Sequence, residues 1–149
     1  MSNEHAGSTS SSRQRGAAAI ELALILPVFI GIVYAIAGYG LAFLMVQSLT
    51  YASEDALRAA LATECAAATC TEAELKPIVA AQVQASLPWL PASLVASATA
   101  GENFFSCDGT MLCTVRLSAT PLIPGITLPL IGEVPDLPDQ LVGRASLRL

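Results

Sequence analysis

Two kinds of residue in this sequence could carry chemistry: one carboxylate inside an apolar stretch, and four cysteines. Glu21 is the single charged residue between Ala17 and Val46. A carboxylate at the centre of a bilayer costs about 2.5 to 3.5 kcal/mol, and less near either end of a spanning helix. Two interpretations of Glu21 are therefore open. It is an interfacial charge that snorkels, or a polar group that meets a partner charge in the membrane plane or within an assembly.

The four cysteines, Cys65, Cys70, Cys107 and Cys113, all follow the apolar stretch. In an exported region this placement favours disulfides over free thiols. Three pairings are possible, and the simplest joins Cys65 to Cys70 and Cys107 to Cys113. A metal site is the alternative, but the only histidine is His5, at the other end of the chain. Four-thiolate zinc sites also usually have closer C-x-x-C spacing. We expect disulfides, no metal and no cofactor.

Catalytic constellations are missing from the sequence after the apolar stretch. That region has no histidine, no G-x-S-x-G or H-E-x-x-H motif and no glycine loop of the kind that binds phosphate. Its carboxylates, of which examples are Glu54, Asp55, Glu64, Glu72 and Glu74, have contexts typical of helix caps and solvated faces. The net charge of −5 argues against nucleic acid as a partner and against a basic surface for anionic lipid. We expect a protein that is not an enzyme.

The element that carries Glu21 is a long helix, predicted over residues 17–62. A bilayer core about 30 Å thick needs about 20 apolar residues as helix. No charged side chain occurs from Leu22 to Ser53, so we predict one transmembrane helix over residues 17–46. Pro27 predicts a kink, which membrane helices tolerate.

The glycines of this helix, Gly31, Gly38 and Gly40, have two interpretations. They offer flat places for the close approach of another helix, or they reflect the general abundance of glycine in membrane helices.

The charges that flank the span predict its orientation. Arg13 and Arg15 precede the span, whereas the first charges after it are Glu54 and Asp55. By the positive-inside rule the N-terminus is cytoplasmic and residues 47–149 lie outside. A secretory signal peptide is disfavoured because its apolar core would be about 7–15 residues, half the length seen here.

The remaining sequence predicts a small α+β domain, since 149 residues are too few for more than one domain beside an anchor. Leu49, Ala52, Ala56, Ala59 and Ala60 share one face of the long helix by spacing. A second, short helix ends near Leu87. It starts either after a capping box at Thr71 and Glu74 or at Pro77.

Beyond residue 92 the period changes to two, which indicates strands. Residues 94–99 predict a weak strand, and residues 104–107 and 111–119 a hairpin about Asp108 and Gly109. Five prolines between residues 121 and 138 predict a loop and exclude a helix or central strand. The alternating end, 141–149, should pair with 113–119 and close a small antiparallel sheet.

The N-terminal motif resembles the processing site of type IV pilin-like proteins. Gly16 precedes Ala17-Ala18-Ala19-Ile20-Glu21 and a long apolar helix. In that family a prepilin peptidase cuts after the glycine, on the cytoplasmic side, and the glutamate then stands fifth in the mature chain. The resemblance implies that residues 1–16 are a leader and that Glu21 pairs with the free N-terminal amine of a neighbouring subunit, since a buried charge is tolerable only when paired.

The sequence most closely resembles TadE-like proteins, the minor pseudopilins of tight-adherence (Flp, type IVb) pili. The motifs that carry the resemblance are R-Q-R-G at 13–16, the glutamate patch at 17–21, L-I-L-P at 24–27 and A-S-E-D-A-L-R at 52–58. The family more often has a glycine before that arginine, which leaves a TadF-type assignment open.

The TadE resemblance implies a role in pilus assembly, adhesion and biofilm formation, with pilin or pseudopilin subunits and the assembly machinery as partners. It also implies a pilin-like fold, in which 47–149 form the periplasmic domain. The alternative function is an unprocessed, membrane-anchored periplasmic scaffold or binding domain.

Overall fold

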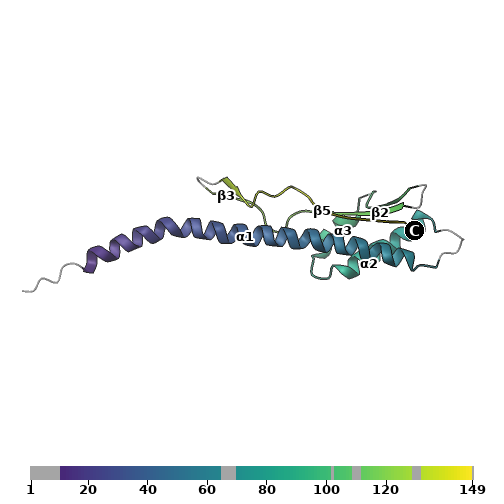
Figure 1. Cartoon of the computed structure of the whole chain (residues 1–149), viewed down its shortest axis with the longest axis horizontal. Helices are drawn as coiled ribbons and strands as arrows, with labels where there is room; N and C mark the ends of the chain where they lie inside the picture. Colours follow the sequence, from purple (N-terminus) through teal and green to yellow (C-terminus); the bar gives the residue numbers. More distant parts are fainter. Residues whose placement is uncertain (1–10, 65–69, 102, 109–111, 129–131, 149) are drawn as a thin grey trace, which may run out of the picture.

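The computed structural model describes residues 11–64, 70–101, 103–108, 112–128 and 132–148. The longest element is one helix, α1 (Ser11–Leu61), and the other helices and strands lie along it (Figure 1). The helix continues through Pro27. The predicted helix is thus confirmed, with an earlier start at Ser11. Among the described residues, one helix, Gly16–Leu61, is long and apolar enough to cross a membrane.

Two short helices and a three-stranded sheet pack around the C-terminal half of α1 and form the head of the molecule. The helices are α2 (Glu72–Ser86) and α3 (Ala92–Thr99). The antiparallel sheet has the order β1-β2-β5, with β1 (Phe105–Cys107), β2 (Leu112–Ala119) and β5 (Leu141–Arg148). The α+β class, the hairpin and the pairing of the last strand with β2 are confirmed. Gly109, in the predicted turn, lies outside the described residues.

The predicted strand over 94–99 is wrong, because these residues form α3. The backbone N–H groups of Leu94 and Val95 both donate to the carbonyl of Pro91 and start a helix there. Val95 and Ala98 are buried three residues apart, which is helical spacing. Alternation of small apolar and polar residues over so short a stretch does not separate strand from helix.

The start of α2 is decided in favour of the capping box. The Thr71 backbone N–H and hydroxyl donate to Glu74 Oε2 at 2.9 Å and 2.8 Å, and Pro77 lies inside the helix. These hydrogen bonds hold the pKa of Glu74 below its usual range. The helix therefore begins before its proline, and the prediction that starts it at Pro77 is wrong.

The proline-rich stretch contains a small hairpin of its own, where the sequence predicted only a loop. Strand β3 (Ile126–Leu128) pairs with β4 (Gly132–Val134), separately from the main sheet. Gly132 has a φ of 92°, which favours glycine. The prolines flank these strands, so the expectation that they exclude a central strand holds.

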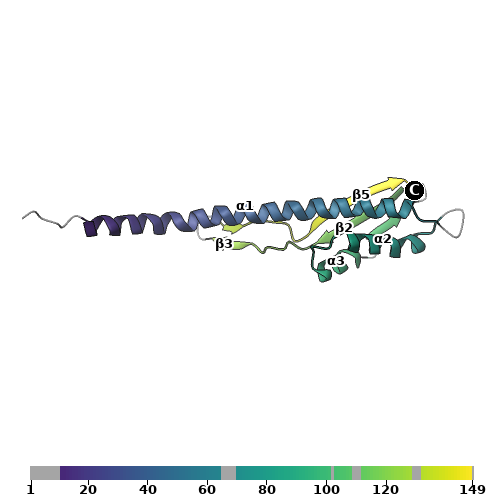
Figure 2. The same cartoon turned by 90° about the horizontal axis from the view of Figure 1, so that it is seen from below.

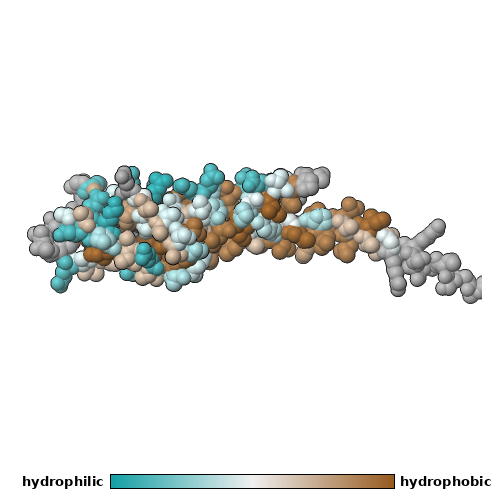
Figure 3. All heavy atoms as spheres, turned by 180° about the vertical axis from the view of Figure 1, so that it is seen from behind, coloured by the Kyte–Doolittle hydropathy of each residue, from teal (hydrophilic) through white to brown (hydrophobic). Residues whose placement is uncertain are grey.

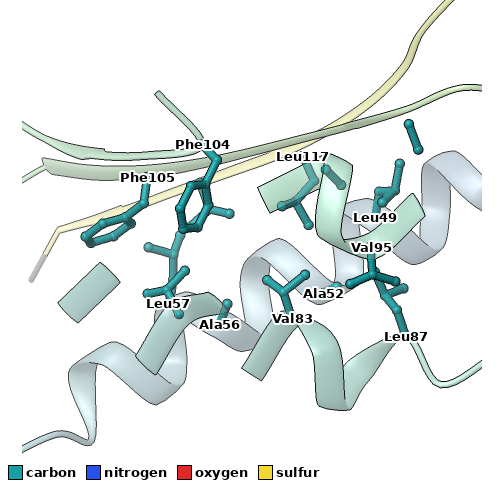
Figure 4. Packing of buried hydrophobic residues seen from close by; sticks show 14 of the residues in the cluster. Leu49, Ala52, Ala56, Leu57, Val83, Leu87, Val95, Phe104, Phe105 and Leu117 are labelled. Atoms are coloured by element: carbon teal, nitrogen blue, oxygen red, sulfur yellow. The ribbon is translucent and has the colours of Figure 1, made fainter. Parts of the chain in front are cut away.

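The core lies between α1 and the inner faces of the head elements. Leu49 of α1 lies near Leu87 and Val95, and Phe105 lies at the other end of the cluster near Leu57 (Figure 4). Along β2 the side chains of Cys113, Val115, Leu117 and Ala119 are buried and alternate with more exposed ones, as predicted.

Strand β5 approaches α1 closely in the core. A Cβ atom added at Gly143 would lie 2.5 Å from the backbone N of Thr50 and 2.6 Å from the carbonyl carbon of Leu49. Both are helix backbone atoms, which cannot turn aside as a flexible side chain could. Only glycine fits at this crossing.

We predict that Gly143→Ala destabilises the head by about 3 kcal/mol, because a methyl group there forces strand and helix apart. The measurement is thermal unfolding of the full chain in detergent micelles. Gly40→Ala is the matched control, because its added Cβ meets open space. An equal melting temperature for both variants would show that β5 does not approach α1 so closely.

Candidate assembly surface on the long helix

The N-terminal half of α1 projects beyond the head (Figure 2). Residues 16–30 of this half are all exposed. Large apolar side chains are exposed all around it, among them Ile20, Leu24, Ile25, Phe29 and Ile30. Figure 3 shows hydrophobic residues gathered on this half and hydrophilic residues mostly over the head. In a lone chain such a surface needs lipid or another apolar helix against it.

The predicted processing residues lie at the start of this uncovered surface. Gly16, Ala17 and Glu21 are all exposed on α1. A Cβ added at Gly16 would meet nothing within 4 Å. Ala17 and Glu21 are four residues apart and so lie on the same face of the helix. The geometry leaves both groups open to a second molecule.

The C-terminal half of α1 presents a narrow buried stripe to the head. Buried positions recur along α1 in steps of three and four from Gly38 onward, at Gly38, Ala42, Met45, Leu49, Ala52, Ala56 and Ala60, with Ser53 and Leu57 buried beside them. Gly31, seven residues before Gly38, is buried as well. Ala59, predicted on the same face, is only half-buried. The stripe begins well inside the predicted transmembrane segment.

The part of the chain that covers the N-terminal end of this stripe is residues 121–128 and 132–138, here called the proline-rich strap. The Tyr34 hydroxyl donates to the carbonyl of Pro124 at 2.7 Å. Farther along, the backbone N–H of Asp136 donates to the Tyr39 hydroxyl at 3.2 Å. Two tyrosines of α1 thus bind the backbone of the strap.

Two of the three helix glycines serve this contact. A Cβ at Gly31 would lie 2.9 Å from Leu128 Cδ1, and one at Gly38 would lie 2.7 Å from Pro135 Cγ. Gly31 and Gly38 therefore allow the strap of the same chain to approach. Gly40 faces open space. Neither sequence interpretation of these glycines anticipated an intramolecular partner.

A polar contact between α1 and α2 fixes the outer part of the head. Asp55 Oδ2 accepts hydrogen bonds from Gln82 Nε2 at 2.6 Å and from Ser86 Oγ at 2.8 Å. These two hydrogen bonds, with a smaller contribution from the charge of Arg58, hold the pKa of Asp55 below its usual range. Sequence reasoning took Asp55 for a solvated carboxylate and missed this role, because the partners are far away in the chain.

The cysteines follow the disulfide expectation as far as the structure describes them. Cys107 and Cys113 form a disulfide across the paired strands β1 and β2, where they stand opposite each other. Cys70 is also disulfide-bonded, whereas its predicted partner Cys65 lies outside the described residues. Within the described residues no group of His, Cys, Asp and Glu could hold a metal ion.

Residues 16–58 match the family model of TadE-like proteins. Over this segment the chain is TadE-like. The TadE-like match begins at Gly16 and covers both the uncovered half of α1 and most of its buried stripe. TadE-like proteins are pilus-related membrane proteins, in a family that is generally structural rather than enzymatic. No curated protein and no solved structure matches the chain.

We predict that Asp55→Ala lowers the stability of the head by about 1 kcal/mol at pH 7, a value reduced for partial exposure. The control is Glu54→Ala, which removes the neighbouring exposed carboxylate. Because the folded-state pKa is depressed, the contribution is present above the unfolded pKa of about 3.9 and is lost as the pH falls through the folded value.

Thermal unfolding of both variants and the parent chain from about pH 7 down to about pH 2, a range that includes the unfolded pKa of about 3.9, measures this difference. A destabilisation by Asp55→Ala that is constant over the whole pH range would contradict the ionic role.

Proposed function

We propose that this TadE-like chain is a minor pseudopilin that takes part in assembly of a tight-adherence pilus. A prepilin peptidase removes residues 1–16 on the cytoplasmic side, and the mature chain then begins at Ala17. Its helix crosses the inner membrane and its head lies in the periplasm. The observation that carries the proposal is the family match that starts at Gly16. The helix that begins there exposes large apolar side chains over residues 20–30.

The uncovered surface supports association as the mechanism. Lipid covers the N-terminal half of α1 while the protein resides in the membrane. Helices of pilin or pseudopilin subunits replace that lipid when the protein enters an assembly. Van der Waals contact between closely packed helices drives association in the membrane, because lipid tails are as apolar as leucine side chains.

The geometry of the mature N-terminus supports the pairing role of Glu21. Cleavage after Gly16 gives Ala17 a free amine, and Ala17 and Glu21 share one helix face. A neighbouring subunit, staggered along the helix axis, then presents its amine to this carboxylate. An unpaired carboxylate among apolar helices is costly, so the pair fixes the register of the subunits.

We predict that two variants at this site affect different steps, maturation in one and pilus assembly in the other. Gly16→Ala blocks maturation, because the peptidase recognises the glycine. Glu21→Ala leaves maturation largely intact and strongly reduces piliation, because the subunits lose their charged register point. Immunoblot mobility measures maturation, and electron microscopy of the same cells counts pili.

Two results would count against the proposal. Normal piliation in the Glu21→Ala strain contradicts the pairing role. Normal mobility and normal piliation in both strains favour the alternative, an unprocessed periplasmic scaffold that stays in the membrane.

A further inference from the structure

We propose that the proline-rich strap is a foot that rests on the outer surface of the lipid bilayer. The foot ends the hydrocarbon span of α1 near Tyr34, so the span is Ala17–Val33 and not the longer 17–46 predicted from sequence. This inference rests on the membrane insertion in the proposed function, and it is independent of processing and of pilus assembly.

The level of the foot along α1 follows from four contacts. Leu128 lies at Gly31, and the carbonyl of Pro124 lies at Tyr34. Pro135 lies at Gly38, and the next residue donates its backbone N–H to Tyr39. The hairpin thus points toward the N-terminus of the helix and lies beside residues 31–39 (Figure 1).

The backbone of the hairpin excludes hydrocarbon at this level. In the part of the chain that the structure describes, strands β3 and β4 pair only with each other, so each has an outer edge without a strand partner there. Open sheet edges do not occur in the lipid-exposed hydrocarbon region, because nothing there satisfies their N–H and C=O groups. Glu133 in β4 and Asp136 beyond it are exposed carboxylates that need water. A hydrocarbon span that reached Val46 would submerge all of them.

The shorter span, Ala17–Val33, is long enough to cross the hydrocarbon core of a bilayer. At 1.5 Å per residue, a helix from Ala17 to Val33 covers about 25 Å, at the lower end of what a bilayer core requires. Arg13 and Arg15 precede it. Tyr34 and Tyr39 follow it, and tyrosine is enriched at the membrane–water interface. Both tyrosine hydroxyls are hydrogen-bonded to the backbone of the foot. The foot therefore lies at the same level along α1 as these two interfacial tyrosines.

The outer surface of the foot fits lipid. Leu122 and Ile126 are large apolar side chains that remain exposed on it. Residues 121–132 contain no charged residue, and the first carboxylate, Glu133, comes on the strand that returns toward the head. The foot meets α1 directly after the exposed apolar residues Phe29 and Ile30, because Leu128 of β3 lies against Gly31. The lipid that surrounds α1 at this level is therefore the partner that we assign to the foot.

Two phenylalanines of α1 test where the span ends. Phe29 is 60% exposed and Phe43 is 65% exposed, and about four helical turns separate them, so they lie on nearly the same face. The full chain carries Phe29→Cys or Phe43→Cys in nanodiscs of phosphatidylethanolamine and phosphatidylglycerol that hold one copy each. A membrane-impermeant maleimide labels water-accessible thiols, and the parent chain gives the background.

We expect labelling of the Phe43→Cys thiol to near completion and at least tenfold slower labelling of the Phe29→Cys thiol. Protection of both thiols overturns the shorter span. Labelling of both thiols means that the helix does not insert, and it overturns the membrane insertion of the proposed function as well.

A tryptophan on the foot tests its contact with lipid. In a Trp89→Phe background, Ile126→Trp places the only tryptophan on β3, and Leu112→Trp is the control on the exposed far end of β2. Lipids brominated near the headgroup should quench the fluorescence of the Ile126→Trp chain strongly and leave that of the Leu112→Trp chain unchanged. Absence of quenching for the Ile126→Trp chain at every protein density overturns the foot. If brominated lipid fails to quench this tryptophan only at high protein density, a second copy of the chain covers the surface instead, which also overturns lipid as its partner.

Discussion

Close backbone approach along one face of α1 is the constraint on which the head and the strap depend. Small residues occupy much of this face, from Gly31 and Gly38 near the strap to Ala52, Ala56 and Ala60 under the head. At one crossing a glycine on the strand side, Gly143, completes the fit. Large side chains at these places would hold strap and sheet away from the helix, and the core would lose its contacts by dispersion.

The sequence was sufficient for elements whose signals are local. The charge-free run defined the helix, and the alternation at Val115, Leu117 and Ala119 defined the central strand with its buried face. The capping box also needed only neighbouring residues. These patterns depend on periods of 3.6 and 2, which a single sequence displays directly.

Besides the strand wrongly predicted over 94–99, the sequence missed the contacts whose partners come from distant parts of the chain. Nothing local to Gly31 or Gly38 indicates that Leu128 and Pro135 pack there. Nothing local to Asp55 indicates Gln82 and Ser86. The apolar run predicts a span up to Val46, and the sequence does not show that the rest of the chain covers one of its faces at Gly31, at Gly38 and from Ala42 onward. A hydropathy pattern indicates that a side chain avoids water, but it does not indicate whether that side chain contacts lipid or protein.

A division of α1 into two parts follows. The first part is uncovered and carries Ala17 and Glu21, whereas the second is joined to the head along one stripe. In the assembly proposed above, a register set by neighbouring subunits at Glu21 would also set the position of every head, because the helix is continuous.

The central claim is that α1 is a pilin-type helix that begins at Ala17 once the leader is removed. The most direct test is the intact mass and N-terminal sequence of membrane-extracted protein from cells with and without a prepilin peptidase. The account predicts a chain that starts at Ala17 only when the peptidase is present. A full-length chain in both strains would contradict it and leave an anchored periplasmic domain. A chain that starts near Gly38 would contradict it too, and would make the apolar run a signal peptide.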